Sequence, residues 1–324
     1  MSAKTRKTNI HRLASVLSGA AILAAAAVAP AYAGVPDANL VDCLRAPMWT
    51  SIAMQANSPD PSNPGYWTYV DGAAGGHGVQ NVGSAPNLGN INGQGGYIRA
   101  TPSGNGYYAI QEDGTMYQRG DATAAPKNIA DVSHYTTDDG DGTMRNPVTG
   151  MAITPTGKGG WVVDAEGDVW TFGDAHAYGS PEDNEVGNAV DIVATPDGEG
   201  YTILTNAGDV YDYGDATFYG HPHFSADGSD PALAQATGIA LTPDDKGYWI
   251  LDNRGEVLPY GDAVDLGDNP KPTSSGMVAT DIATLPDGSG YAIITDNGTV
   301  NIYRAGIDHR PTTSSSLHGS GHRH

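Results

Sequence analysis

The stretch Thr195-Pro-Asp-Gly-Glu-Gly-Tyr201 returns 47 residues later, slightly altered, as Thr242-Pro-Asp-Asp-Lys-Gly-Tyr248. Further versions occur along the chain, and one proline marks the same point in each copy: Pro61, Pro102, Pro155, Pro196, Pro243 and Pro286. The 324 residues therefore contain six copies of one unit, 41 to 53 residues apart. Repeats of this length that contain several short strands are typical of β-propeller blades.

Each copy has the same order of short apolar runs and turns. An apolar run such as Ile192–Thr195 precedes the proline, and a β-rich run such as Tyr201–Thr205 follows it. A turn that contains glycine leads into an alternating run such as Val210–Tyr213. Glycine turns between strands favour tight hairpins because glycine tolerates positive φ. A Gly-Asp-Ala turn and a short run that ends in Tyr219-Gly220 complete the copy.

Four short strands per copy predict an all-β chain. We expect a six-bladed β-propeller of four-stranded blades over residues 47–305, with a seven-bladed ring as the alternative. The last copy lacks a fourth run, and residues 34–46 are expected to supply a ring-closing strand, since an open sheet edge exposes unpaired backbone groups. Residues 306–324 are rich in serine and histidine and are expected to be disordered.

The N-terminus has the pattern of a secretory signal peptide. Four basic residues in the first twelve positions precede an alanine-rich apolar run, which ends in Pro30-Ala-Tyr-Ala33. We therefore predict cleavage after residue 33 and a secreted protein, extracellular or associated with the cell surface. The alternative is a membrane anchor, but the apolar run is shorter than the ~20 residues that a spanning helix needs.

Charge and cysteine content exclude several classes of protein. The chain has 37 acidic against 16 basic side chains, a net charge of −21. This balance argues against a nucleic-acid partner, because affinity for phosphates depends on clustered Lys and Arg. It favours a soluble monomer. The single cysteine, Cys43, excludes a disulfide scaffold and a zinc site of the Cys-x-x-Cys type.

The repeat resembles that of a known group. Its pattern, Thr-Pro-x-Gly-x-Gly-Tyr followed by Gly-x-Val-x-x-Tyr-Gly-Asp-Ala-x-x-Tyr-Gly, is similar to the propeller-type repeats of secreted actinobacterial proteins. The resemblance covers roughly residues 47–305. It implies a β-propeller outside the cell and no particular activity, because that group has no shared function. The first copy departs from the pattern, since Ser84 stands where other copies have the aspartate of Gly-Asp-Ala.

Two sets of residues recur once per copy, and we interpret both as structural. The aspartates of the Gly-Asp-Ala turns are Asp121, Asp174, Asp215 and Asp262. An aspartate beside glycine in a turn commonly accepts hydrogen bonds from nearby backbone N–H groups. The aromatic residues at one phase of the second run are Trp67, Tyr108, Trp161 and Trp249. We expect them to fill the spaces between blades, although such a stripe could also stack on sugars.

Two insertions outside the repeat are the candidate sites. The first contains Asp138, Asp139 and Asp141 among glycines, a pattern that suits calcium, although a solvated loop is the alternative. The second contains His221, His223, Asp227 and Asp230, which could bind a ligand or a transition metal, although a surface loop is again the alternative. Both insertions follow a blade's last strand, so we expect them on the face of the glycine hairpins, which is acidic.

No catalytic signature stands out in the sequence, which lacks nucleophile-elbow, zincin, P-loop and Rossmann patterns. We therefore expect a binding or scaffold module that recognises an extracellular protein, a glycan or a cell-wall component through its acidic loop face. The alternative is an extracellular glycoside hydrolase or lyase with a carboxylate-based site in the axial channel. Aliphatic residues along the channel would favour binding, and clustered acids would favour an enzyme.

Overall fold

A computed structural model describes residues 50–70, 78–91, 96–112, 114–124, 147–181, 188–222, 224, 234–267 and 278–305. The chain divides into two units, Met1–Ala33 and Gly34–His324, and all of the described residues belong to the second. The predictions for residues 1–33, 34–46 and 306–324 thus concern segments outside the described residues. No helix in the described ranges is long and apolar enough to cross a membrane.

The described residues form six antiparallel sheets of three strands each, one for every copy of the repeat. In chain order the sheets consist of β1 (Thr50–Met54), β2 (Tyr66–Val70) and β3 (Gly78–Val82); β4 (Gly96–Ala100), β5 (Tyr107–Gln111) and β6 (Met116–Arg119); β7 (Val148–Ile153), β8 (Gly159–Asp164) and β9 (Val169–Gly173); β10 (Ala189–Ala194), β11 (Gly200–Thr205) and β12 (Val210–Gly214); β13 (Ala236–Leu241), β14 (Gly247–Asp252) and β15 (Val257–Gly261); β16 (Ala279–Thr284), β17 (Gly290–Thr295) and β18 (Val300–Arg304). The all-β prediction is confirmed.

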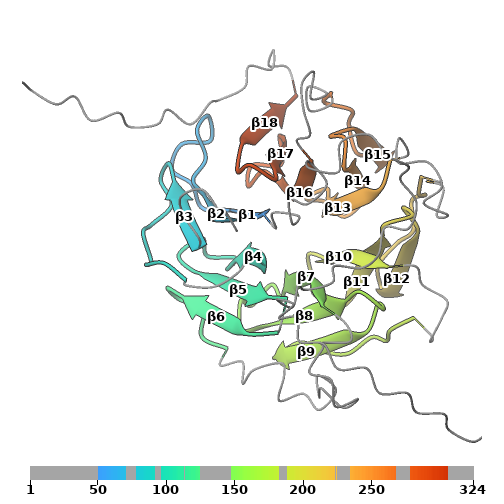
Figure 1. The fold of residues 1–324 in the computed structure, drawn as a ribbon, viewed down its shortest axis with the longest axis horizontal. Helices are drawn as coiled ribbons and strands as arrows, with labels where there is room; N and C mark the ends of the chain where they lie inside the picture. Colours follow the sequence, from blue (N-terminus) through green and yellow to red (C-terminus); the bar gives the residue numbers. More distant parts are fainter. Residues whose placement is uncertain are drawn as a thin grey trace, which may run out of the picture. The chain divides into compact units, whose positions relative to one another are not determined.

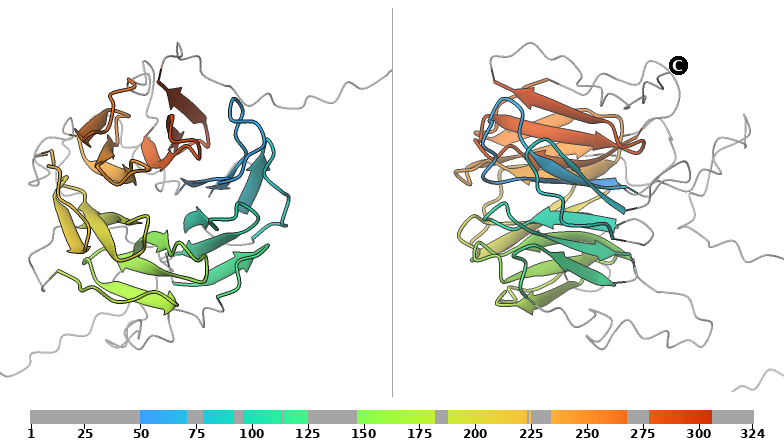
Figure 2. Two further views of the ribbon diagram at one scale, coloured as in Figure 1. Left: turned by 180° about the vertical axis from the view of Figure 1, so that it is seen from behind. Right: turned by 90° about the vertical axis from the view of Figure 1, so that its left-hand side faces the viewer.

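The first strand of each sheet faces a common axis, in the arrangement of a β-propeller (Figure 1). Strands β1, β4, β7, β10, β13 and β16 each contact the next in this order, and β16 contacts β1. Figure 2 shows the same ring from behind and from the side. The last sheet therefore packs against the first, so that both flanks of every sheet are covered by a neighbour.

The prediction of a fourth strand in each sheet is wrong for the described residues. In the third sheet the outer segment, which ends in Tyr178-Gly179, has no strand structure. Side chains hold it instead: the indole Nε1 of Trp161 donates a hydrogen bond to the carbonyl of His176 at 2.6 Å, and the Tyr201 hydroxyl donates to the carbonyl of Gly179. The carbonyls of His176 and Gly179 are thus satisfied by side chains and not by a backbone ladder.

The aromatic stripe lies between sheets, as predicted. Its members are all buried: Trp67, Tyr108, Trp161 and Trp249. Each packs at a tilt against an aromatic ring of the next sheet, with ring centroids 5.7 Å apart for Trp67 and Tyr107 and 5.4 Å apart for Trp249 and Tyr291. Tilted aromatic pairs at this separation add to the stabilisation from burial alone.

One sheet lacks the usual tyrosine and replaces it from another strand. Gly160 stands at the position of Tyr107 and Tyr201, and a Cβ atom at Gly160 would lie 2.7 Å from Cζ of Phe172. Phe172, from the adjacent strand β9, packs against Tyr108 with ring centroids 5.5 Å apart. The same space between sheets is thus filled from a different place in the sequence.

The aspartates of the Gly-Asp-Ala turns have the predicted structural role, through a partner that we did not predict. Each accepts a hydrogen bond from the threonine that precedes the marker proline, 20 residues earlier: Asp121 from Thr101 at 2.8 Å, Asp174 from Thr154 at 2.9 Å, Asp215 from Thr195 at 3.2 Å and Asp262 from Thr242 at 3.4 Å. In the first sheet both partners differ, and the Ser84 hydroxyl donates to Oε1 of Gln55 at 2.7 Å. The bond joins the two turns at one end of each of these five sheets, whereas the sixth has Leu285 in place of the threonine.

We expect Asp174→Ala to lower the free energy of unfolding by about 2 kcal/mol, because hydrogen bonds to charged groups contribute about 1.5–3 kcal/mol. Asp174 accepts from Thr156 at 2.6 Å as well as from Thr154. Denaturant titration measures the change, and Asp174→Asn, which keeps one acceptor oxygen, should lose less. Equal stability of Asp174→Ala and the unaltered protein would contradict this role.

Candidate functional site

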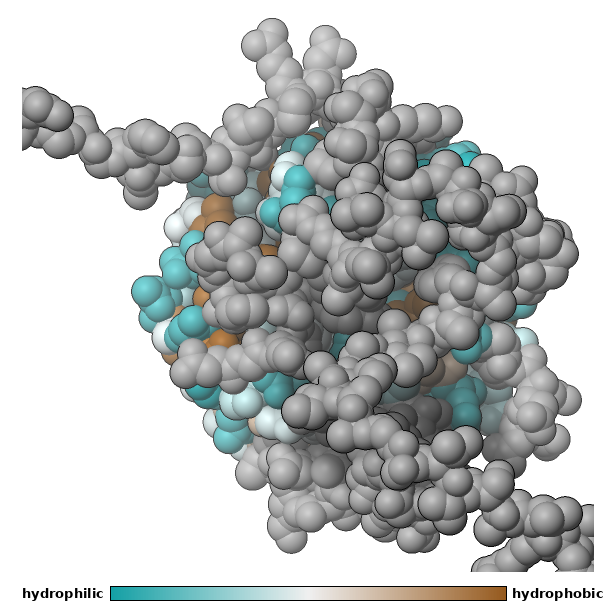
Figure 3. Space-filling model, in the orientation of Figure 1, coloured by the Kyte–Doolittle hydropathy of each residue, from teal (hydrophilic) through white to brown (hydrophobic). Residues whose placement is uncertain are grey.

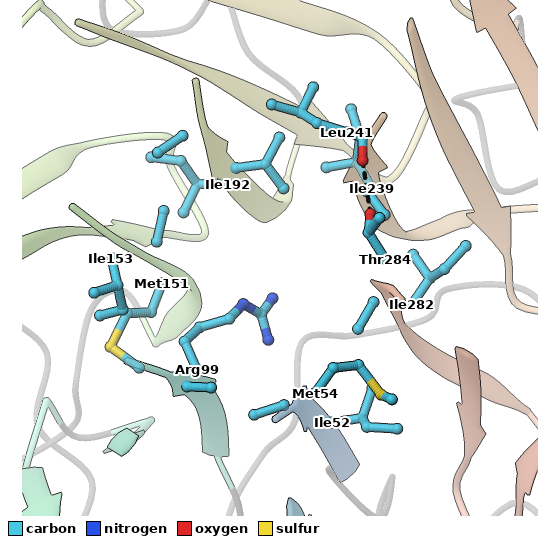
Figure 4. Close-up of a pocket in the computed structure, with 17 residues that line it drawn as sticks. Ile52, Met54, Arg99, Met151, Ile153, Ile192, Ile239, Leu241, Ile282 and Thr284 are labelled. Carbon is cyan, nitrogen blue, oxygen red and sulfur yellow. Dashed lines mark hydrogen bonds between the residues drawn. The ribbon is translucent and has the colours of Figure 1, made fainter. Parts of the chain in front are cut away.

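A cavity of about 300 Å³ lies between the six inner strands, along the axis of the ring. Aliphatic side chains make up most of its wall (Figure 4). They come from equivalent positions of the inner strands: Ile52, Met54, Met151, Ile153, Ile192, Val193, Ile239, Leu241 and Ile282. The only polar groups that line it in the described part of the chain are Arg99 and Thr284, whose hydroxyl donates to the carbonyl of Leu241 at 2.6 Å.

The guanidinium of Arg99 points into the middle of this cavity (Figure 4). It donates through Nη2 to Oδ1 of Asp191 at 3.0 Å and through Nη1 to Oδ2 of Asp281 at 3.0 Å. The side chain of Arg99 is 18% exposed, and those of the two aspartates are 2% and 3% exposed. These three residues belong to β4, β10 and β16 and therefore join the second, fourth and sixth sheets across the ring.

Both aspartates also bind the backbone of the next sheet. Asp191 accepts from the N–H of Ile239 at 3.2 Å, and Asp281 accepts from the N–H of Ile52 at 3.1 Å. The Ser51 hydroxyl adds a bond of 2.6 Å to Oδ2 of Asp281. Buried carboxylates are tolerated only when their oxygens are bonded in this way. The network therefore links neighbouring sheets as well as alternate ones.

The charges in the network shift each other's pKa values. Burial alone would lower the pKa of Arg99, but the carboxylates of Asp281 and Asp191 outweigh it and raise that pKa further. Burial raises the pKa of Asp191 to about 7 despite the opposing effect of Arg99, and Asp281 adds to the increase. Two carboxylates share one guanidinium here, so the network favours an additional proton near neutral pH.

The alternative hypothesis of a carboxylate-based enzyme placed its site in this channel. Asp191 and Asp281 bind the guanidinium that points into the channel, but neither lines it, and both are also bound by backbone N–H groups. Glycoside hydrolysis needs one carboxyl that gives a proton to the substrate and a second one that faces it. The observed hydrogen bonds suit a structural ion network better, and the aliphatic wall is the lining that we associated with binding.

We expect Arg99→Met to lower the free energy of unfolding by about 3–5 kcal/mol, because its removal leaves two buried carboxylates without a cation. The triple variant that also contains Asp191→Asn and Asp281→Asn should recover most of this loss. Thermal melts of both proteins test the expectation. The loss in Arg99→Met should shrink as the pH falls and the carboxylates bind protons; a loss that is independent of pH would count against the network.

Of the four predicted site residues in the histidine loop, the structure describes His221 alone. Nδ1 of His221 lies 3.4 Å from Oδ1 of Asp209, at the hairpin between β11 and β12, and the N–H of Phe224 donates to the carbonyl of Ala207 at 3.1 Å. His221, Pro222 and Phe224 therefore lie at the glycine hairpin of their own sheet. His223, Asp227 and Asp230 lie outside the described residues.

The predicted calcium ligands Asp138, Asp139 and Asp141 also lie outside the described residues. Their role thus stays a prediction. Within the described ranges, no three His, Cys, Asp or Glu side chains are grouped closely enough to hold a metal ion.

The hairpins between second and third strands carry exposed carboxylates. Glu166 is exposed, and the side chains of Asp209 and Glu256 are 43% and 37% exposed. Because every such hairpin lies at the same end of its sheet, these acids share one face of the ring with His221. Figure 3 shows that hydrophilic residues prevail among the described residues of the face in view.

Asp164, in one of these hairpins, is a buried acid with an unusual environment. It is 1% exposed, and its Oδ1 accepts from the N–H groups of Glu166 and Asp168 at 3.0 and 2.9 Å. Its Oδ2 is buried and has no hydrogen-bond partner in the described part of the chain. The equivalent acid of the fifth sheet, Asp252, receives a bond from Nε of Arg254 at 2.9 Å. Burial raises the pKa of Asp164 to about 6.

We expect Asp164→Asn to stabilise the protein by on the order of 1 kcal/mol near neutral pH. The folded-state pKa of about 6 exceeds the ordinary value of 3.8, so the folded protein holds this proton more tightly and loses stability as the pH rises through 6. The amide cannot ionise, so the gain should vanish near pH 4. Thermal melts across this range measure it.

Asp252→Asn is the matched control for this substitution. Asp252 occupies the same hairpin position as Asp164, but its replacement by asparagine removes the charge that pairs with Arg254. The substitution should therefore destabilise the fold at neutral pH. Equal effects of the two substitutions would contradict the assigned difference between these acids.

Comparison with known proteins shows limited similarity. No family model matches the chain, and no curated protein matches it either. A structural genomics protein of unknown function from Bacteroides thetaiotaomicron VPI-5482 is 15% identical over 79% of this chain and 69% of its own, with a TM-score of 0.45. The β-propeller domain of Cps50 (Swd1) from Myceliophteria thermophila is 11% identical over 79% of this chain and 83% of its own, with a TM-score of 0.44.

Proposed function

We propose that this chain is the precursor of a secreted six-bladed β-propeller that acts as a binding or scaffold module outside the cell. Its partner would be a protein, a glycan or a cell-wall component, held on the acidic face of hairpins and insertions. In this proposal the six sheets are the blades of a closed ring, and the N-terminal 33 residues direct export and are removed.

The observation that supports this proposal best is a contrast between two places: the charged groups at the axial cavity are ion-paired, whereas Glu166 on the hairpin face is exposed and unpaired among the described residues. In the axial cavity, the guanidinium of Arg99 is bound by two carboxylates within an aliphatic wall. On the hairpin face, Glu166 faces solvent and belongs to no ion pair among the described residues. Glu166 can therefore contact a partner without first breaking an internal ion pair, whereas Asp209 and Glu256 each face one basic side chain, His221 and Arg254, at 3.4 Å.

The N-terminal sequence supports export. A basic start, an apolar run and small residues before Gly34 form a pattern that is removed in secreted proteins. Mass spectrometry of the protein recovered from the medium of the producing organism tests this step, because a chain that begins at Gly34 is the expected product. An intracellular chain that retains Met1 would contradict it.

Capture of partners from the organism's surface and medium, followed by a glycan array, tests the binding role. We expect the variant Glu166→Lys, Asp209→Lys and Glu256→Lys to lose most of the captured partner at low salt, because it reverses the charge of the hairpin face. The loss should be smaller at high salt, where surface charges are screened.

A control variant makes the same change of charge at the opposite end of the sheets: Glu199→Lys, Asp244→Lys and Asp287→Lys. It should retain binding if its thermal melt shows a folded protein. Loss of partner in both variants, or in neither, would contradict recognition through the hairpin face.

A further inference from the structure

A tyrosine fills the same cleft at two successive interfaces between sheets. Tyr178 follows the third sheet, and its hydroxyl donates to the carbonyl of Gly198, in the Thr-Pro turn of the fourth sheet, at 3.0 Å. Tyr219 follows the fourth sheet and donates to the carbonyl of Asp245, in the equivalent turn of the fifth sheet, at 2.7 Å. Each phenol thus occupies the space between an outer segment and the next sheet's turn.

The following interface has no tyrosine at this position. Leu266 follows the fifth sheet where Tyr178 and Tyr219 follow the earlier ones. A cavity of about 220 Å³ lies there, between Leu266 and the turn at Gly288 of the sixth sheet. One contact of the cleft is kept, since the Tyr291 hydroxyl donates to the carbonyl of Gly267 at 2.6 Å, as Tyr248 does to that of Gly220. The ring is missing, and Ser289 stands where the fourth sheet has Glu199, whose Oε2 accepts a hydrogen bond from the Tyr178 hydroxyl at 3.2 Å.

The cavity keeps the groups that a phenol would need. The carbonyl of Gly288 corresponds to those that Tyr178 and Tyr219 bind, and no described side chain donates to it. Trp249 and Leu266 provide apolar walls. Trp249 is the fifth-sheet equivalent of Trp161, and the ring centroids of Trp161 and Tyr178 are 6.4 Å apart. For comparison, an apolar cavity of roughly 150 Å³ holds a benzene ring.

We propose that this cleft between the fifth and sixth sheets is a binding site for one phenolic ring, whose hydroxyl donates to the carbonyl of Gly288. The ring could belong to a free small phenol or to a tyrosine side chain of a partner. Asp244 and Asp262 also line the cleft, which disfavours phenols that carry a carboxylate. The site is at the opposite end of the sheets from the hairpin face and does not depend on the function proposed above.

Titration of the protein with p-cresol, followed by calorimetry and by NMR, tests this inference. One equivalent should bind, and it should bind several-fold tighter than toluene, which lacks the hydroxyl that donates to Gly288. Leu266→Tyr should fill the cleft with the protein's own phenol. It should therefore raise Tm and weaken p-cresol binding about tenfold or more.

Tyr219→Leu is the converse variant, because it should open the same cleft one interface earlier. A folded Tyr219→Leu protein should bind a second equivalent of p-cresol. Leu266→Phe provides a further test if Leu266→Tyr does not fold, since its ring should block the cleft without supplying a hydroxyl. Absence of p-cresol binding to the unaltered protein, or binding that Leu266→Tyr and Leu266→Phe leave intact, would overturn the proposal.

A blocked Gly-Tyr-Gly peptide separates the two sources of the phenol. If the peptide competes with p-cresol, the cleft accepts a tyrosine within a chain and the partner is a protein. If p-cresol binds and the peptide does not, the ligand is a free phenol. Both results support a phenol site, and they differ in what brings the ring.

Discussion

The structure depends on the contact between the flank of one sheet and the flank of the next. A three-stranded sheet of this size cannot cover its own apolar faces, and aromatic pairs such as Trp161 with Tyr201 lie where two sheets meet. Every interface thus requires a neighbour on its far side, and the contact of β16 with β1 supplies the last one. The same condition explains why Phe172 fills the place that Gly160 leaves open, since a gap there would cost packing energy.

Much of this arrangement could be predicted from the sequence, because each sheet repeats the same physical requirements. The marker prolines, the hairpin glycines and the buried aromatic stripe predicted the number of sheets, the order of their strands and the side on which they pack. The outer segments were the error. Their tyrosine and glycine residues look like a short strand, but Tyr201 and Trp161 satisfy their carbonyls from the side, and a ladder is then unnecessary.

The axial network could not be predicted from the repeat, because it consists of departures from it. Arg99 stands where the other inner strands carry Ala53, Ala152, Val193, Ala240 and Ala283, and that single exception was the available signal. Its partners Asp191 and Asp281 are distant in sequence, and only the closed ring brings them together. The insertions that drew attention by their length, by contrast, lie mostly outside the described residues, so their role stays a prediction.

The position of Arg99 has a consequence for how the protein unfolds. Proteins built from repeats are commonly coupled only between adjacent units, so that one end can fray while the remainder persists. Here a single side chain connects units that are not adjacent, and each unit also has two neighbours. Loss of any one of the second, fourth or sixth sheets leaves a buried charge without its counterpart in the others. The ring should therefore open in one cooperative step rather than lose its repeats in sequence.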